Sequence, residues 1–314
     1  MERVLITGGT GFIGANFVRK FIERGDEVHI TIRKDSNLWR INDIQKKIFM
    51  HIADITDKTA VDDIFKLVNP QIVLHFAAHG AGSAKDRNDV GGTVAINLLG
   101  TINLADAFAE FGGRCFINVG SSSEYGKKDH PISEDNVLAP ESLYGITKAA
   151  ATLYCSTLAK QKNLPMVTLR LFSPFGYFEG EGRLMHTIVN AALSSKKFEA
   201  PSPHIVRDSL FIDEVVNAFD LAIRNIQKIK GEVINIASGE QHSVAEIVAI
   251  VQKITGLKFE VIYGNIPLMQ SEPKMWVADI SKAKRLLEWQ SAHTFEEGLK
   301  KYVQWSRGNI GKIN

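Results

Sequence analysis

The sequence contains very little cysteine and no marked excess of charge of either sign. Only 2 of its 314 residues are cysteines, which excludes a disulfide framework and is typical of a protein from a reducing compartment. Its 37 basic and 35 acidic residues leave a net charge of +2. A protein that binds nucleic acid or a membrane surface would show a clear basic excess. The hydrophobic share of 45% argues against disorder.

Long hydrophobic runs are also missing. No stretch approaches 18 uninterrupted apolar residues, so we expect no transmembrane helix. The N-terminus has no basic segment followed by an apolar one, so it does not resemble a signal peptide. Cys115 and Cys155 lie in apolar or helical runs and are expected to be buried thiols. We therefore expect a cytoplasmic protein with a sizeable core and no membrane or nucleic-acid partner.

The first half of the chain alternates short β-branched runs with helical patterns. This alternation predicts an α/β fold, a doubly wound parallel sheet of the Rossmann type with helices on both faces. Strands are expected at 4–6, 28–32, 48–52, 72–76, 115–119 and 166–171. Helices are expected between them at 11–24, 57–68, 92–111 and 143–162.

The pattern changes after Pro174. Helices are expected at 183–193, 213–227, 243–255 and 294–306, and strands at 233–236 and 258–263. We predict a dinucleotide-binding domain over residues 1–174 and about 208–240. A smaller, discontinuous α/β portion over 175–207 and 241–314 is expected to bind the substrate.

The segment TGGTGFIG at 7–14 directly follows the first expected strand and opens the first expected helix. A dinucleotide site needs glycines in this setting for a tight turn, for close approach of the backbone to a pyrophosphate, and for close packing of helix on strand. The N–H groups and dipole at the helix N-terminus then attract the phosphates. The segment predicts a cofactor loop of Gly8, Gly11, Phe12, Ile13 and Gly14.

The end of the second expected strand distinguishes NAD from NADP. An acidic residue there hydrogen-bonds the ribose 2′-hydroxyl, whereas an arginine accommodates a 2′-phosphate. Arg33 has this position, and Lys34 and Ser36 beside it can also hold a phosphate. NADP(H) is therefore favoured, with NAD(H) as the alternative because Asp35 lies among them. Asp54-Ile55, after the third expected strand, is expected to contact the adenine.

Tyr144 and Lys148 lie four residues apart in an expected helix, which places both side chains on one face. A free tyrosine has a pKa of about 10, too high for a base at neutral pH. A nearby ammonium stabilises the phenolate and lowers that pKa. The serines at 121–123 follow the fifth expected strand, where doubly wound sheets bind ligands. Such a trio can move a proton while a nicotinamide moves a hydride.

Together these motifs resemble a known family. The loop at 7–14, HFAA at 75–78, Asn97, the serine run, YGITK at 144–148 and RDSLFIDEVV at 207–216 are similar to an extended short-chain dehydrogenase/reductase of the nucleotide-sugar epimerase/dehydratase/4-ketoreductase group. The resemblance implies that Tyr144 is the acid and base and that Lys148 binds the nicotinamide ribose. It implies Ser122 as the catalytic serine, with Ser123 as the alternative. The further cofactor residues that it implies are Ala77, Ala78, Asn97, Phe172 and Pro174.

The resemblance also implies a nucleotide diphosphate sugar as substrate. Ser173 stands where the family commonly has an asparagine that contacts the diphosphate. Arg183 and Arg207 are candidates for pyrophosphate contacts, because a guanidinium matches phosphate geometry. His186 and His204 have no companions at metal-ligand spacing, so no metal is expected.

Three reactions fit this set of residues: 4-epimerisation, 4,6-dehydration and reduction of a 4-keto sugar. In dehydratases of this group a glutamate close after the catalytic serine or threonine is the base, and Glu124 is the candidate here. The segment at 121–126 is one residue shorter before its tyrosine than the dehydratase pattern. It is closer to that of 4-keto-6-deoxy sugar nucleotide reductases. We therefore predict such a reductase, with a 4-epimerase second and a dehydratase third.

Two other questions stay open at this point. A non-enzymatic NADP sensor of similar fold would typically lack the tyrosine and lysine, so Tyr144 and Lys148 favour an enzyme. The small residues Ala149, Ala150 and Ala151 resemble the helix face through which family members dimerise. We expect a homodimer, although a contact inside the chain's own core would give the same pattern.

Overall fold

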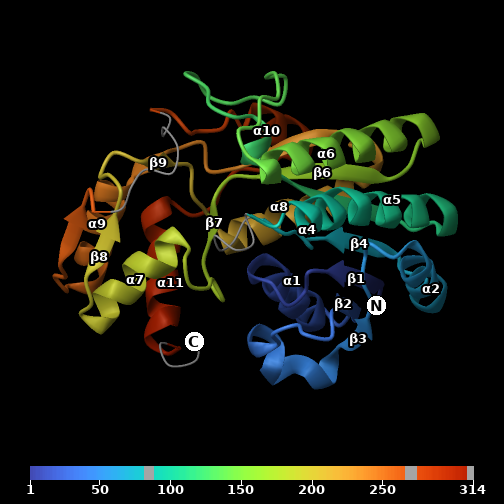
Figure 1. Cartoon of the computed structure of the whole chain (residues 1–314), viewed down its shortest axis with the longest axis horizontal. Coiled ribbons are helices and arrows are strands. Elements are labelled where there is room, and N and C mark those ends of the chain that lie inside the picture. The colour runs from blue at the N-terminus through green and yellow to red at the C-terminus, as the bar shows by residue number, and fades with distance from the viewer. Residues whose placement is uncertain (81–87, 266–273, 310–314) are drawn as a thin grey trace. The chain divides into compact units, whose positions relative to one another are not determined.

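The structure is a computed structural model that describes residues 1–80, 88–265 and 274–309 (Figure 1). The chain divides into two compact units. Unit 1 comprises residues 1–126, 137–171 and 218–234, and unit 2 comprises residues 127–136, 172–217 and 235–314. Both units are discontinuous, because the chain leaves and re-enters each of them.

A seven-stranded sheet lies at the centre of unit 1, in the order β11-β6-β5-β4-β1-β2-β3. Figure 1 labels its strands β1 to β4 and β6. Neighbouring strands from β3 to β6 pair in parallel. The order reverses at β1, which confirms the doubly wound, Rossmann-type fold. The strands span Arg3–Thr7 (β1), Glu27–Ile32 (β2), Phe49–Ile52 (β3), Ile72–His75 (β4), Cys115–Ser121 (β5), Met166–Leu171 (β6) and Val233–Ile236 (β11).

Helices cover both faces of this sheet. On one face, apolar side chains of α2, α5 and α6 pack against Leu5 of β1 and Phe116 of β5. On the other face, the Phe17 ring of α1 lies 4.7 Å from the rings of Phe76 and of Phe219 in α8. The strands are apolar almost throughout because both faces are covered. The helices span Phe12–Glu23 (α1), Lys58–Val68 (α2), Gly100–Phe111 (α5), Leu143–Lys162 (α6) and Ile212–Asn225 (α8).

The helix before β5 runs from Val90 to Phe111 in three parts. These parts are α4 (Val90–Val94), a π-helical segment η2 (Ala95–Leu99) and α5. By length and composition, this is the one helix in the described part of the chain that could cross a membrane. Its polar groups are used inside unit 1: Thr101 Oγ1 lies 2.8 Å from His75 Nε2, and the Asn103 amide donates to Ile55 O at 3.0 Å. It packs as a core helix beside α2 and α6.

Unit 2 is built from helices and short strand pairs. β7 pairs with β10 and β8 with β13 in parallel, whereas β9 and β12 are antiparallel. Helices α7, α9 and α11 pack on one another. The strands span Pro174–Phe175 (β7), Phe198–Ala200 (β8), Val206–Arg207 (β9), Leu210–Phe211 (β10), His242–Ser243 (β12) and Val261–Tyr263 (β13). The helices span Leu184–Ser194 (α7), Val244–Thr255 (α9), Ser281–Leu287 (α10) and Phe295–Arg307 (α11).

The division of the chain differs from the expected domain boundaries. Residues 208–217 and 235–240 belong to unit 2, although we expected them in the dinucleotide-binding domain. Residues 127–136 also belong to unit 2. We expected the N-terminal part of the dinucleotide-binding domain to end at residue 174. The part of unit 1 that contains β6 ends at residue 171 instead.

Long-range hydrogen bonds explain why these segments join unit 2. The Ile132 N–H donates to Val277 O at 2.8 Å, and Glu134 accepts the Asn235 N–H at 2.7 Å. The buried Asp208 carboxylate accepts backbone N–H groups from Ser238, Gly239 and Ala278. Burial raises the pKa of Asp208 to about 6, although each of these donors opposes the shift. Contacts of this kind have no periodic signal in the sequence.

Candidate active site

The loop between β1 and α1 is made of glycines that leave room for a ligand. Gly8 has a φ of +70°, and a Cβ there would lie 2.6 Å from Ala77 N. A Cβ on Gly14 would lie 2.2 Å from Gly8 O, so only glycine lets α1 pack this closely on the loop. Gly11 is the N-cap and has no side chain to fill the space before Phe12, the first residue of α1. This cradle fits the pyrophosphate of a dinucleotide.

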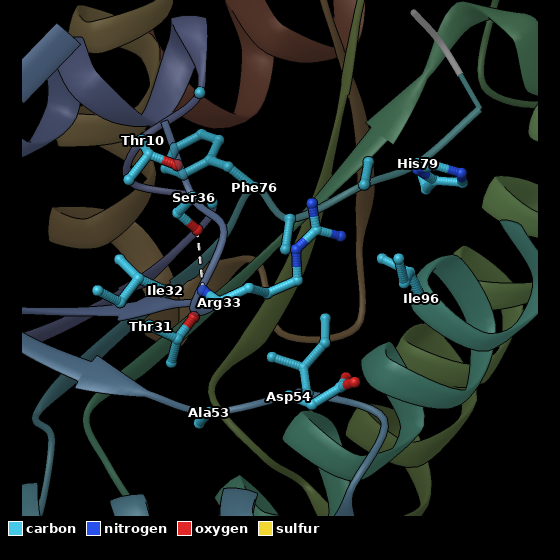
Figure 2. A pocket seen from close by; sticks show the side chains of 15 residues that line it. Thr10, Thr31, Ile32, Arg33, Ser36, Ala53, Asp54, Phe76, His79 and Ile96 are labelled. Atoms are coloured by element: carbon cyan, nitrogen blue, oxygen red, sulfur yellow. Dashed lines mark hydrogen bonds between the residues drawn. The ribbon is translucent and has the colours of Figure 1, made fainter. Parts of the chain in front are cut away.

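A cavity of about 270 Å³ lies at the carboxyl ends of β1 to β4 (Figure 2). The predicted cofactor residues that line it are Gly8, Gly11, Arg33, Ser36, Asp54, Ile55, Ala77 and Ala78. Its other lining residues, which were not predicted individually, are Thr10, Thr31, Ile32, Ala53, Phe76, His79 and Ile96. Each of these lies within two residues of a predicted one, and all except Ile96, which lies on the π-helical segment, are in or directly after a strand or in the loop that follows it.

The Arg33 side chain reaches across the middle of this pocket (Figure 2). Its backbone N–H donates to Ser36 Oγ at 2.9 Å, which fixes the turn after β2. Its Nε lies 3.4 Å from Asp35 Oδ1, and both side chains are exposed. Lys34 is exposed and is not among the described residues that line the pocket. Of the three residues predicted to hold a 2′-phosphate, Arg33 and Ser36 line the pocket.

Asn97 lies on the π-helical segment and is buried. Its Oδ1 accepts the His79 N–H at 2.8 Å, and its Nδ2 donates to His79 O at 2.9 Å and to Thr147 Oγ1 at 3.0 Å. Thr147 lies in α6 between Tyr144 and Lys148. Asn97 therefore joins a wall of the pocket to the helix that bears the tyrosine and lysine.

The structure brings Tyr144, Lys148 and the serine segment together in unit 1. Tyr144 is half-buried at the start of α6, and Lys148, one turn later, is only 2% exposed. Burial lowers the pKa of Lys148 from its usual value. Gly145 permits the close approach, because a Cβ there would lie 2.4 Å from Ser123 O. Ser122, directly after β5, is buried beside this contact.

The structure places Glu124, the candidate dehydratase base, among buried partners. Its side chain is fully buried, and Arg170 Nε donates to its Oε2 at 2.7 Å. Its Oε1 accepts the Ser121 N–H at 2.7 Å and the Thr152 hydroxyl at 3.1 Å. Both carboxylate oxygens are therefore held by hydrogen bonds inside unit 1, and a catalytic role for Glu124 stays a prediction.

The remaining predicted residues lie in unit 2. Phe172 is buried, and Ser173 has a φ of +27°, a conformation that is uncommon outside glycine. Arg183 precedes α7 and donates from Nη2 to Pro174 O at 2.8 Å. Arg207 lies half-buried in β9. Their roles toward a cofactor or substrate stay predictions.

The fold and the site define an enzyme of the extended short-chain dehydrogenase/reductase type. It combines a doubly wound sheet and a glycine phosphate loop with a Tyr-x-x-x-Lys helix next to a serine segment. The chain belongs to the NAD dependent epimerase/dehydratase family, whose pattern matches residues 4–237.

Comparison with individual proteins places known 4-epimerases among its relatives. The chain is 29% identical to a UDP-glucuronate 4-epimerase of Thermodesulfobacterium geofontis, over 100% of this chain and 98% of the relative. It is similar to the crystal structure of UDP-glucose 4-epimerase with UDP-glucose from Thermotoga maritima (TM-score 0.88, 28% identity, 98% and 99% of the two chains). It is also similar to a UDP-glucuronic acid 4-epimerase from Bacillus cereus in complex with UDP-glucuronic acid and NAD (TM-score 0.85, 26% identity, 97% and 99% covered).

These findings change two of the sequence predictions. The 4-epimerase interpretation, second in our sequence order, fits the relatives better than the 4-ketoreductase that we placed first. The reductase prediction rested on the length of the segment at 121–126 and on the basic residues at the end of the second strand, and neither of these features identifies the reaction. Membership of an enzyme family also removes the NADP-sensor alternative.

Proposed function

We propose that this protein is a nucleotide-sugar 4-epimerase that inverts C4 of a UDP-linked hexose, with a nicotinamide dinucleotide in the pocket at the ends of β1 to β4. The observation that carries this proposal is the juxtaposition of Tyr144, Lys148 and the serine segment in a chain similar to 4-epimerases over its whole length. Arg183 and Arg207 are the proposed contacts to the substrate diphosphate, with Ser173 beside the first.

The chain's own residues supply the proton chemistry. A nicotinamide cofactor held by the glycine loop and Arg33 would supply a hydride acceptor and donor for C4 of the sugar. Tyr144 Oη accepts the proton of the 4-hydroxyl and later returns it. The Lys148 ammonium stabilises the Tyr144 phenolate, and its burial strengthens this interaction because the local dielectric is low. Ser122 Oγ hydrogen-bonds the same sugar oxygen and orients it.

The position of Glu124 supports this reaction over dehydration. Elimination of water needs a carboxylate that can reach a carbon next to the oxidised one. Glu124 was the sequence candidate for this role, and it is buried against Arg170 instead. The site therefore favours a reaction that needs only the proton relay of Tyr144.

Replacing the tyrosine tests the proposal. Tyr144→Phe should lower the rate of interconversion of UDP-glucose with UDP-galactose, or of UDP-glucuronate with UDP-galacturonate, by on the order of 10²–10⁴-fold. The products are separated chromatographically. Tyr154→Phe is the matched control, because Tyr154 is on the same helix and its hydroxyl donates to Asp106. Near-normal turnover by Tyr144→Phe would remove this residue from the mechanism.

The choice between NAD and NADP depends on Arg33 in this proposal. The Bacillus cereus neighbour is in complex with NAD. Here, however, Arg33 and Ser36 line the pocket where an acidic residue would select NAD. We therefore infer that the site accepts NADP, with the Arg33 guanidinium on its 2′-phosphate.

Arg33→Asp should raise the ratio of NAD affinity to NADP affinity by about tenfold or more, because a charge-assisted phosphate contact is lost and a carboxylate is added. Equilibrium titration of each cofactor measures the ratio. Lys34→Asp changes the net charge equally at an exposed neighbour and should leave the ratio almost unchanged. An equal response to both substitutions would show that only the overall charge of this loop matters.

The expected homodimer can use one residue of the small-residue run, because Ala150 is half-buried and lies on the same face of α6 as Ile146 and Leu153. Ala149 and Ala151 are buried inside unit 1, so their pattern belongs to the core of the chain itself. The same helix exposes Ile146 and Leu153, and the neighbouring α4 exposes Val94. We propose a cytoplasmic homodimer formed through these apolar side chains.

A further inference from the structure

One buried carboxylate joins three parts of the candidate active site. Glu124 accepts hydrogen bonds from the Ser121 N–H at the end of β5 and from Thr152 Oγ1 in α6. Its other oxygen accepts Arg170 Nε of β6 at 2.7 Å. A Cβ on Gly120 would lie 2.7 Å from Glu124 Oε1, so the strand end leaves room for the carboxylate. The serine segment, the Tyr-x-x-x-Lys helix and β6 therefore share one anchoring group.

Arg170 also contacts the Tyr125 side chain in two ways. Its Nη1 donates to Tyr125 Oη at 2.7 Å, and its guanidinium stacks 4.6 Å over the Tyr125 ring. Arg170 and Glu124 are both buried, so each depends on the other for its charge. Burial raises the pKa of Glu124, whereas Arg170, the Ser121 N–H and Lys148 all oppose this by stabilising the carboxylate.

Thr152, which donates to this carboxylate, lies one turn after Lys148 on the same face of α6, so the helix brings Lys148 close to Glu124. Burial lowers the pKa of Lys148, and the charge that opposes this most strongly is Glu124. Two other titratable groups among the described residues couple to Lys148, and both are neutral at pH 7. Burial lowers the pKa of His75 in β4 to about 3, and it raises the pKa of Cys155 in α6 to about 12. Asp106 of α5 acts on Cys155.

We propose that Glu124 is the positioning residue of the Tyr144–Lys148 pair. Held by Arg170, its carboxylate fixes α6 against the serine segment and supplies the negative charge that keeps the buried Lys148 ammonium protonated. The consequence for catalysis rests on the proposed function, because it is there that the Lys148 ammonium stabilises the Tyr144 phenolate. The charge relation between Glu124 and Lys148 stands without it.

The test measures Lys148 directly. Protein labelled with ¹³C at the lysine Cε is titrated by NMR, and the Lys148 signal is assigned by its absence from Lys148→Met. In Glu124→Gln the pKa of Lys148 should fall by about one unit or more, because an opposite charge at close range shifts a pKa by that amount. An unchanged Lys148 pKa in this variant would overturn the proposal.

Two further variants separate charge from packing. Thr152→Val removes a hydrogen bond to the same carboxylate but no charge, so it should leave the pKa of Lys148 unchanged. A fall in this pKa as large as in Glu124→Gln would show that packing causes the effect, and it would contradict the proposal. If Glu124→Gln fails to fold because Arg170 is left unpaired, Glu124→Gln/Arg170→Met removes both charges. The pKa of Lys148 should still be lowered in that double variant, and an unaltered pKa in it would also contradict the proposal.

The activity measurement is kept separate. If UDP-sugars are epimerised, the alkaline limb of the kcat/KM profile should move to lower pH in Glu124→Gln by the same amount as the NMR titration, but not in Thr152→Val. If no nucleotide sugar is turned over, the proposed function is wrong. The titration of Lys148 still tests whether the Glu124 carboxylate raises the pKa of Lys148.

Discussion

Each unit of this molecule buries a glutamate against an arginine, but the two pairs differ in how completely they are satisfied. In unit 1, both oxygens of Glu124 accept hydrogen bonds, and the Arg170 side chain is 4% exposed. In unit 2, Glu179 Oε1 accepts Arg183 Nε at 2.9 Å, whereas Oε2 has no hydrogen-bond partner among the described residues. The Arg183 side chain is 41% exposed.

This difference shows which buried carboxylates keep a fixed charge. Water near Arg183 screens its attraction for Glu179, and burial raises the pKa of Glu179 to about 7. Glu179 is therefore poised to take up a proton near neutral pH. Burial also raises the pKa of Glu124, but three donors, one of them the desolvated Arg170, oppose this shift and stabilise the carboxylate.

Removing each arginine gives the largest expected contrast. Arg170→Met leaves an uncompensated buried carboxylate and should lower the free energy of unfolding by about 3–5 kcal/mol. Arg183→Met should cost only about 1 kcal/mol, because its partner Glu179 can become neutral by binding a proton. Urea unfolding of both variants at pH 7 measures the two costs. Equal costs would mean that the two pairs are alike.

A smaller effect concerns the pH dependence of stability. The folded pKa of Glu179, about 7, lies above its ordinary value of 4.5, so the folded protein binds the extra proton between these values. Its contribution to stability is therefore present below pH 4.5 and is lost as the pH rises to 7. At about 1.4 kcal/mol per unit, the loss is on the order of 3 kcal/mol.

Glu179→Gln should abolish this loss, so its stability relative to the unsubstituted protein should rise as the pH increases from 4.5 to 7. Unfolding in urea at a series of pH values measures the difference. Glu181→Gln, at an exposed glutamate two residues further on, should show no such trend. A Glu179→Gln curve parallel to the unsubstituted one would place the Glu179 pKa near its ordinary value.

The sheet and its helices were predictable because each is a long apolar pattern. β6 spans the predicted residues Met166–Leu171, and α6 spans the predicted range 143–162. Unit 2 was less predictable. Its two-residue strands, such as β9 and β12, and the short α10 are fixed by contacts such as those of Asp208 rather than by periodicity.

The candidate site was predictable in its motifs but not in the role of Glu124. The glycine loop and the strand ends predicted much of the pocket lining, because the backbone geometry of this fold determines which residues lie there. The partner of Glu124 is 46 residues away and is brought close by the pairing of β5 with β6, where Arg170 lies opposite Gly120. A signal was present: an arginine in the otherwise mainly apolar run MVTLRL requires a buried partner.

The central claim is tested most directly by the cofactor balance of the reaction. The purified protein is incubated with a panel of UDP-, GDP-, CDP- and dTDP-sugars, including a nucleotide-linked 4-keto-6-deoxyhexose with NADPH. We expect conversion of a UDP-hexose to its 4-epimer with no net oxidation or reduction of the cofactor. Stoichiometric oxidation of NADPH by the 4-keto sugar, with no epimer formed from any UDP-hexose, would identify a reductase instead.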